Sequence, residues 1–132
     1  MRFFKEIIAL IFIIAFLIIS DEYVSRYTQS AIEEMDKKTD EIINLVLNHE
    51  EYNEEDSLNK INDFEKEWKE VEDKLAYFSE HDELEKVSVS ITLMKANMEM
   101  NMKEDAYEKM QEIKFRIEHI KTKQKFALNN LF

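Results

Sequence analysis

The chain of 132 residues contains no glycine, no proline and no cysteine. Because glycine is absent, tight turns that depend on its positive φ angle are not expected, and because proline is absent, no ring interrupts a helix. The absence of cysteine excludes disulfides and thiolate metal sites. Together these absences favour helices that are joined by short polar turns.

Basic residues are also scarce, since 18 Lys and Arg stand against 29 Asp and Glu, for a net charge of −11. A chain this acidic is not expected to bind nucleic acid, whose phosphates would repel it. High charge can also indicate disorder, but apolar residues, including one Trp, recur here at regular spacing. We therefore interpret the acidic residues as the solvated outer face of one folded domain.

An unbroken run of thirteen apolar residues, Ile7 to Ile19, lies close to the N-terminus. At ~1.5 Å per residue the run spans about 20 Å, which is short of the ~30 Å hydrocarbon core of a bilayer. Counting from Phe3 brings the length nearer to that of a membrane span. The run is therefore interpreted as an export signal that also anchors the chain.

Arg2 and Lys5 precede the apolar run. The positive-inside rule then places the N-terminus in the cytoplasm, and Lys5 can extend its ammonium group towards the lipid headgroups. We predict a transmembrane signal anchor at residues 1–20 and an extracytoplasmic domain at residues 21–132, in a single-pass protein of the cell membrane.

Two other interpretations of the N-terminal segment remain open. A signal peptide could be cleaved between Ser20 and Asp21, although no A-x-A sequence precedes that bond. Alternatively, the protein could be soluble and bury its first helix.

Apolar residues at spacings of three and four predict a first helix from Asp21 to about Glu50, continuous with the anchor, with residues 21–30 as a stalk. The polar, acidic stretch Glu50–Ser57 is the predicted first turn, and a second helix is predicted over Leu58–Ser79. The apolar positions of these two helices are Val24, Ala31, Ile32, Met35, Ile42, Ile43 and Val46, then Leu58, Ile61, Phe64, Trp68, Val71, Leu75 and Phe78.

Two capping pairs predict where the next helices begin. Asp82 with Glu85 precedes a third helix that ends near Asn101, and Asp105 with Glu108 precedes a fourth. Their apolar positions are Leu84, Val87, Ile91, Met94, Met98 and Met102, then Ala106, Met110, Ile113, Ile117, Ile120, Ala127 and Leu131.

The predicted fold is therefore all-α, with the N-terminal anchor helix followed by an antiparallel up-down bundle of four helices, the first continuous with the anchor. In this topology the acidic turn lies at the distal tip and the C-terminus points back at the membrane. A long three-helix coiled coil is the alternative architecture.

Two stretches, EKEWKEVEDKLAYFSEHDELEKVSVSI and YEKMQEIKFRIEHIKTKQKFALNNLF, carry a resemblance to a known family. Trp68 in its helix, the break at His81–Glu83, the segment Glu112–Ile120 and Asn130 before two apolar residues resemble the bacterial domain of unknown function 4363. With the anchor, the resemblance covers nearly the whole chain. It implies a short, membrane-anchored accessory protein of spore-forming Gram-positive bacteria, with no activity or binding residues to carry over.

Three methionines, Met98, Met100 and Met102, form an M-x-M-x-M run of the kind that binds Cu(I) through thioethers. On a helix Met100 points away from the face that Met98 and Met102 share, so a three-sulfur site requires the helix to unwind. Filling of the core by flexible methionine side chains is the better interpretation.

The three histidines offer little as metal ligands. His81 and His119 can approach one another in the membrane-proximal half of the predicted bundle, but His49 belongs to the distal end, so a three-histidine site is not expected. We predict no metal or other cofactor, with Met98, Met100, Met102, His81 and His119 as the candidate residues if one is bound.

Trp68, Phe64, Tyr77 and Phe78 could hold a ligand between helices, but at helical spacing they are expected in the core. Neither a nucleophile with its base nor a phosphate-binding glycine loop is present. We therefore do not expect an enzyme.

The basic C-terminal segment has two interpretations. Its lysines can complement the dipole of the last helix while Phe126 and Leu128 complete the core. Alternatively, the segment contacts anionic lipid headgroups or a membrane partner. The candidate contact residues are Lys121, Lys123, Lys125 and Phe132, with Phe126, Leu128 and Leu131 between them.

The leading functional hypothesis is a non-enzymatic, membrane-anchored interaction or accessory protein that docks on an integral membrane or envelope partner. One alternative is a ligand-sensing helical bundle without its own output domain. Another is an extracytoplasmic metal binder that uses the methionine run. A homo-oligomer is compatible with each of these functions.

Overall fold

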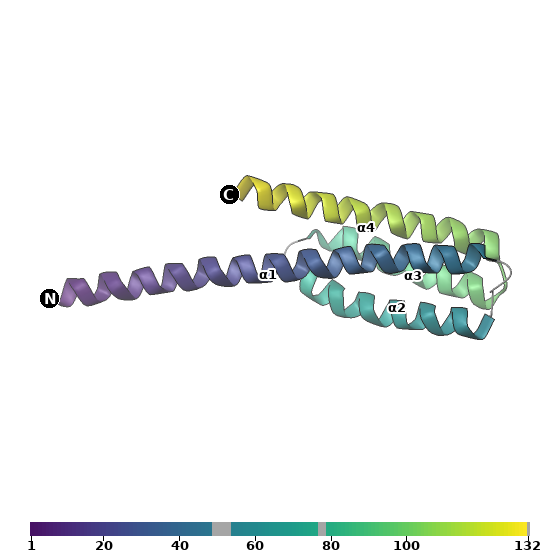
Figure 1. Ribbon diagram of the computed structural model, residues 1–132, viewed down its shortest axis with the longest axis horizontal. Coiled ribbons are helices and arrows are strands. Elements are labelled where there is room, and N and C mark those ends of the chain that lie inside the picture. Colours follow the sequence, from purple (N-terminus) through teal and green to yellow (C-terminus); the bar gives the residue numbers. More distant parts are fainter. Residues whose placement is uncertain (49–53, 77–78, 132) are drawn as a thin grey trace.

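The computed structural model describes residues 1–48, 54–76 and 79–131, with the side chains of residue 54 and residues 127–131 outside the description. Within these ranges the chain forms four α-helices. They are α1 (Arg2–Leu47), α2 (Glu54–Leu75), α3 (His81–Glu99) and α4 (Lys103–Leu131) (Figure 1). The predicted all-α fold is confirmed.

Helix α1 is unbroken over 46 residues, a length of about 70 Å. Its first half projects from the molecule, and its second half packs into the bundle (Figure 1). The predicted continuity of the apolar segment with the first helix is therefore confirmed. The stalk is shorter than the predicted residues 21–30, because the side chain of Thr28 is already buried.

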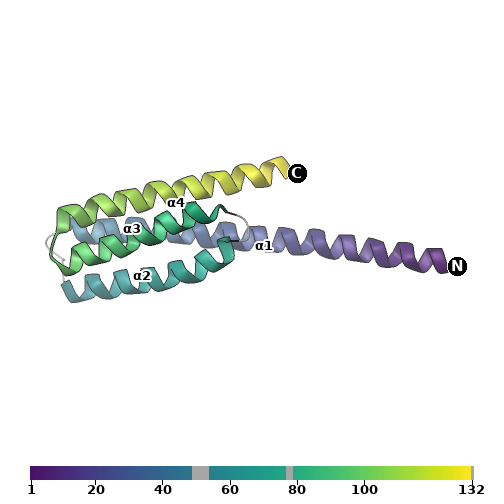
Figure 2. The same ribbon diagram turned by 180° about the vertical axis from the view of Figure 1, so that it is seen from behind.

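The four helices form an antiparallel bundle. The backbone of α1 lies close to those of α2 and α4, and the backbone of α3 lies close to the same two helices, whereas among the described residues α1 and α3, and likewise α2 and α4, are diagonally opposed. Each helix therefore lies beside its neighbours in the chain, and α4 closes the bundle against α1 (Figures 1 and 2). The alternative of a three-helix coiled coil is wrong.

The core is built from one apolar stripe of each helix, and most of its residues were predicted from their spacing. Val24 and Met102 are exceptions, because the structure leaves both exposed. Met102 lies beyond the end of α3, and Val24 lies on the part of α1 that precedes the bundle. The buried apolar residues are Ile32, Met35, Ile42, Ile43, Val46, Ile61, Phe64, Trp68, Leu75, Leu84, Val87, Ile91, Met94, Met98, Ala106, Met110, Ile113, Ile117 and Ile120.

Two threonines of α1 also occupy buried positions. The hydroxyl of Thr39 donates to the carbonyl of Met35 at 2.8 Å, and that of Thr28 donates to the carbonyl of Val24. A buried hydroxyl that is hydrogen-bonded within its own helix avoids the cost of an unsatisfied polar group. These residues fill the gaps in the apolar stripe of α1.

The helices begin and end at different residues from those predicted. Helix α2 covers Glu54–Leu75 instead of Leu58–Ser79, so part of the acidic stretch is helical. The N-cap of α3 is Glu80, and α4 begins at Lys103. Asp82 and Asp105, predicted as caps, lie instead in the first turns of these helices, where a negative charge complements the helix dipole.

In the turn between α3 and α4, an asparagine takes the place of the glycine that the chain lacks. Asn101 has a φ angle of 59°, in the left-handed region. The amide of Met102 donates to the carbonyl of Asn97 at 2.8 Å, and that of Asn101 to Met98 at 3.1 Å. This pair of hydrogen bonds is the Schellman motif, in which Asn is the usual substitute for glycine.

We therefore expect Asn101→Gly to raise the stability of the protein by up to about 1 kcal/mol, and Asn101→Val to lower it by about 1 to 2 kcal/mol. Asn62, which is exposed within α2, is the matched control. There glycine should destabilise the helix. Thermal unfolding of the detergent-solubilised chain, monitored by circular dichroism, measures the stability of the variants at Asn101 and at Asn62. A stabilising effect of glycine at both positions would contradict the assignment.

Candidate functional site

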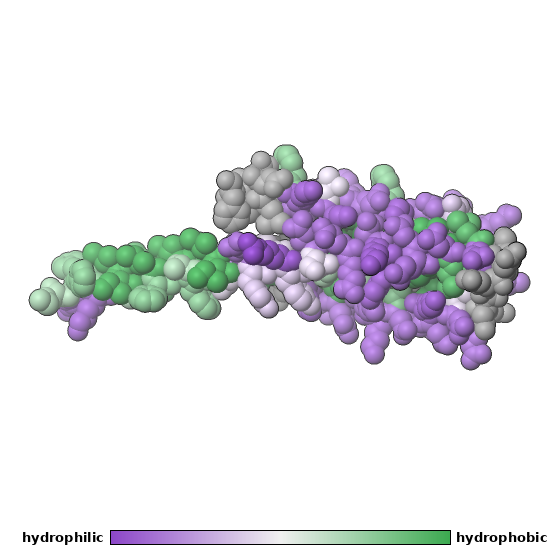
Figure 3. All heavy atoms as spheres, viewed as in Figure 1, coloured by the Kyte–Doolittle hydropathy of each residue, from purple (hydrophilic) through white to green (hydrophobic). Residues whose placement is uncertain are grey.

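The most conspicuous surface of the molecule is the apolar first half of α1. Phe3, Phe4 and Phe12 are among its side chains, and all three are at least two thirds exposed. Figure 3 shows this segment as an apolar rod that projects from a largely hydrophilic bundle. Helix α1 is the one helix among the described residues that is long and apolar enough to cross a membrane. So much contiguous apolar surface is rare on a soluble protein.

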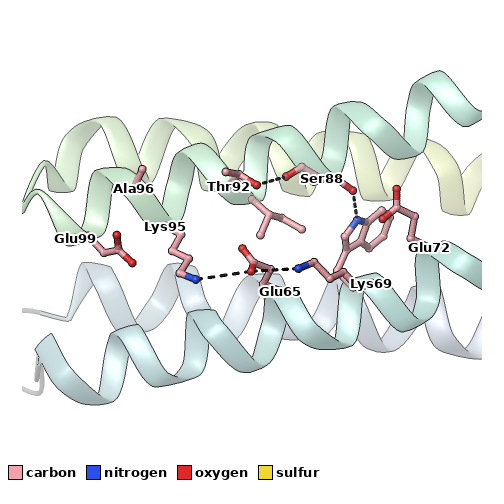
Figure 4. A pocket seen from close by; sticks show the side chains of 10 residues that line it. Glu65, Lys69, Glu72, Ser88, Thr92, Lys95, Ala96 and Glu99 are labelled. Atoms are coloured by element: carbon pink, nitrogen blue, oxygen red, sulfur yellow. Dashed lines mark hydrogen bonds and ion pairs between the residues drawn. The ribbon is translucent and has the colours of Figure 1, made fainter.

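A groove of about 450 Å³ lies between α2 and α3, and it is open to solvent (Figure 4). Glu65 of α2 forms ion pairs with Lys69 of the same helix and with Lys95 of α3, each with an N···O distance of 3.7 Å. Trp68 lies at its base, almost fully buried, and its indole N–H donates to the hydroxyl of Ser88 at 2.8 Å. The hydrogen bond between Trp68 and Ser88 therefore joins α2 to α3 beside the groove.

The Trp68 indole should be a major source of stability, and Trp68→Ala should cost about 3 to 5 kcal/mol. Ser88→Ala should cost about 1 to 3 kcal/mol, because it removes the acceptor of a buried indole N–H. The exposed hydroxyl of Thr92, which donates to the carbonyl of Ser88, provides the control Thr92→Ala. Urea unfolding in detergent micelles is the measurement. A loss below ~1 kcal/mol for Trp68→Ala would show that the indole is not part of the core.

A second open groove, of about 390 Å³, runs along the surface between α3 and α4. Val89 and Leu93 of α3 line it and are about half exposed. On α4 the carboxylate of Glu112 accepts hydrogen bonds from Lys109 and Arg116, each at 3.0 Å. The hydrogen bond from Lys109 is the main cause of a lowered pKa of Glu112, and the hydrogen bond from Arg116 lowers this pKa further. The groove thus combines exposed aliphatic side chains with a fixed cluster of charges.

Most of the large apolar side chains that are exposed along the bundle lie on α3 and α4. Val89 and Leu93 lie on α3, and Phe115 and Phe126, which are 71% and 69% exposed, lie on α4. On α1 within the bundle Leu47 is such a side chain, at the distal end of the helix, and none is exposed in the described part of α2. Sequence analysis missed Val89, Leu93 and Phe115 because they lie off the apolar stripes.

The three candidate lysines of the C-terminal segment differ in their surroundings. Lys121 pairs with Asp36 of α1 at 3.6 Å, and Lys123 pairs with Glu83 of α3 at 2.7 Å. The hydrogen bond to Glu83 raises the pKa of Lys123. Lys125 is exposed and has no ion pair with any residue that the structure describes. Two of the three lysines are therefore already engaged within the bundle.

Among the apolar residues that follow these lysines, the structure describes only the side chain of Phe126. Phe126 does not complete the core, as one interpretation had it, because its side chain is exposed. The side chains of Leu128, Leu131 and Phe132 lie outside the described residues.

The candidate metal ligands do not assemble among the described residues. Met98 is buried in the core, whereas Met100 and Met102 are exposed in the turn that follows α3. His119 lies 3.4 Å from Glu83, and His81 is exposed at the start of α3. No group of three or more His, Asp or Glu side chains suited to a metal ion occurs in the described part of the chain, and His49 lies outside it.

These features define a class of protein: a four-helix bundle whose first helix begins with an apolar segment and is long and apolar enough to cross a membrane. The chain belongs to the family described as Domain of unknown function (DUF4363), whose family model matches residues 22–131. The match begins directly after the apolar segment and covers the entire bundle. No curated protein and no solved structure shows significant similarity to the chain.

Proposed function

We propose that the protein is a membrane-anchored interaction module, which holds its helical bundle outside the cytoplasmic membrane and docks on an integral membrane or envelope partner. The observation that supports this proposal is the continuity of α1. The apolar segment and the core residues Ile32 to Val46 belong to the same unbroken helix. A helix without glycine or proline lacks the usual causes of a kink, so the membrane span would orient the bundle directly.

The uneven surface of the bundle supports a docking role. Exposed apolar side chains on otherwise charged helices are frequent at protein–protein contacts. Here they gather on α3 and α4, beside the charge cluster around Glu112, whereas α2 presents a polar face. The side formed by α3 and α4 is therefore the proposed docking surface.

The proposed topology can be tested directly because the chain lacks cysteine, so each introduced cysteine is unique. Asn48→Cys, exposed at the distal end, should react with a membrane-impermeant maleimide in intact cells. A cysteine in an N-terminal tag should react only after permeabilisation. The protein should also stay in the membrane pellet after alkaline carbonate washing. Release of a chain that begins at Asp21 would falsify the anchor.

The docking surface can be tested by photocrosslinking in the native membrane. A photoreactive amino acid at Leu93 or Phe115 should form adducts with a membrane or envelope protein, because both side chains are exposed on the proposed surface. The same amino acid at Asn62, which is exposed on α2, is the matched control. Equal adducts from all three positions, or none from Leu93 and Phe115, would contradict the proposed surface.

A further inference from the structure

The C-terminal part of α4 extends beyond the ends of α2 and α3, alongside α1 (Figures 1 and 2). Two ion pairs fix its register against α1, from Lys114 to Asp40 and from Lys121 to Asp36. From Lys121 the helix continues for about ten residues, or ~15 Å, towards the anchor. Its end at Leu131 is therefore level with about Arg26 of α1.

This end of α4 lies close to the expected membrane surface. Arg26 follows Ile19 by about seven residues, or ~10 Å of helix. The apolar segment from Phe3 to Ile19 spans about 25 Å, less than the ~30 Å hydrocarbon core, so the mismatch draws the bundle towards the bilayer or thins the bilayer locally. The headgroup layer adds about 5 to 8 Å on each side of the hydrocarbon. The end of α4 thus reaches the level of the headgroups, and Lys125, six residues before that end, lies ~9 Å further out, about one Debye length from the lipid charges.

The chemistry of this end matches a lipid surface. From His119 to Phe132 the sequence has three lysines and no acidic residue, in a chain whose net charge is −11. Lys125 keeps an exposed ammonium group, and the adjacent Phe126 is 69% exposed. On α1, between the anchor and the bundle, Tyr23 is 73% exposed. Aromatic and basic side chains are the usual anchors of a protein at the membrane interface.

We propose that the C-terminal end of α4, through Lys125 and Phe126, makes a second membrane contact with the headgroups of anionic phospholipids. This inference rests on the anchoring role proposed for α1. Lys121 and Lys123 hold the segment against Asp36 and Glu83, so that Lys125 remains to meet the lipid phosphates. A bundle attached at both α1 and α4 tilts less freely than one held by α1 alone, and its α3 and α4 surface keeps one orientation to the membrane.

The test uses the full-length chain reconstituted into vesicles of phosphatidylcholine, alone or mixed with phosphatidylglycerol. A donor fluorophore on Thr122→Cys, an exposed position near Lys125, transfers energy to an acceptor on lipid headgroups. Transfer should be higher in the anionic vesicles and fall with added salt, because salt screens the attraction. A donor on Met100→Cys, at the far end of the bundle, should show no dependence on lipid charge.

Substitutions identify the residues responsible. Lys125→Gln should shift the ratio of bound to free helix ends by about fivefold in anionic vesicles, and Phe126→Ser should lower it further. Leu47→Ser is the matched control, because Leu47 is also an exposed apolar residue but lies at the distal end of α1. Lys66→Gln, on the exposed side of α2, is the control for charge.

Co-flotation of the chain with the vesicles separates the two proposals. If the chain co-floats but transfer is independent of lipid charge and of both substitutions, the anchor stands and the second contact is overturned. If Phe126→Ser instead removes a co-purifying membrane protein without any effect of lipid charge, the segment binds protein and the lipid assignment is wrong. A chain that does not co-float overturns the anchor and the second contact together.

Discussion

The constraint on which the rest of the structure depends is the unbroken backbone of α1. Helices α2 and α4 pack directly beside it, and α3 lies diagonally opposite, between those two. No glycine or proline occurs in the chain, so nothing in α1 provides the usual cause of a kink between the apolar segment and the core. The direction of the apolar segment therefore fixes the direction of the bundle.

Because α1 is continuous, each face of the bundle keeps a fixed orientation relative to the apolar segment. If α1 were hinged, every side of the bundle could turn towards a membrane neighbour, and an uneven surface would have little consequence. With a continuous α1, the side formed by α3 and α4 keeps a defined height and direction. The apolar side chains exposed there, Val89, Leu93 and Phe115, therefore hold a fixed position relative to the apolar segment.

Helical periodicity predicted the helices and most of the core, because burial of one stripe is a property of each helix alone. The ends were less predictable: α3 and α4 begin at His81 and Lys103, not at the predicted capping pairs, and Asn101 replaces the glycine of a Schellman turn. Tertiary register was not visible either. The pairing of Lys121 with Asp36 depends on how α4 lies against α1, and off-stripe residues such as Phe115 carry no periodic signal.

The same register limits the kind of partner that can dock on the bundle. Because Lys114 pairs with Asp40, the neighbouring Phe115 lies at the height of Asp40, about 21 residues and ~30 Å of helix beyond Ile19. Val89 lies on the same side of the bundle, on the adjacent α3. A membrane protein with only short external loops would not reach these side chains. The proposed partner must therefore extend about 30 Å from the membrane, or belong to the envelope outside it.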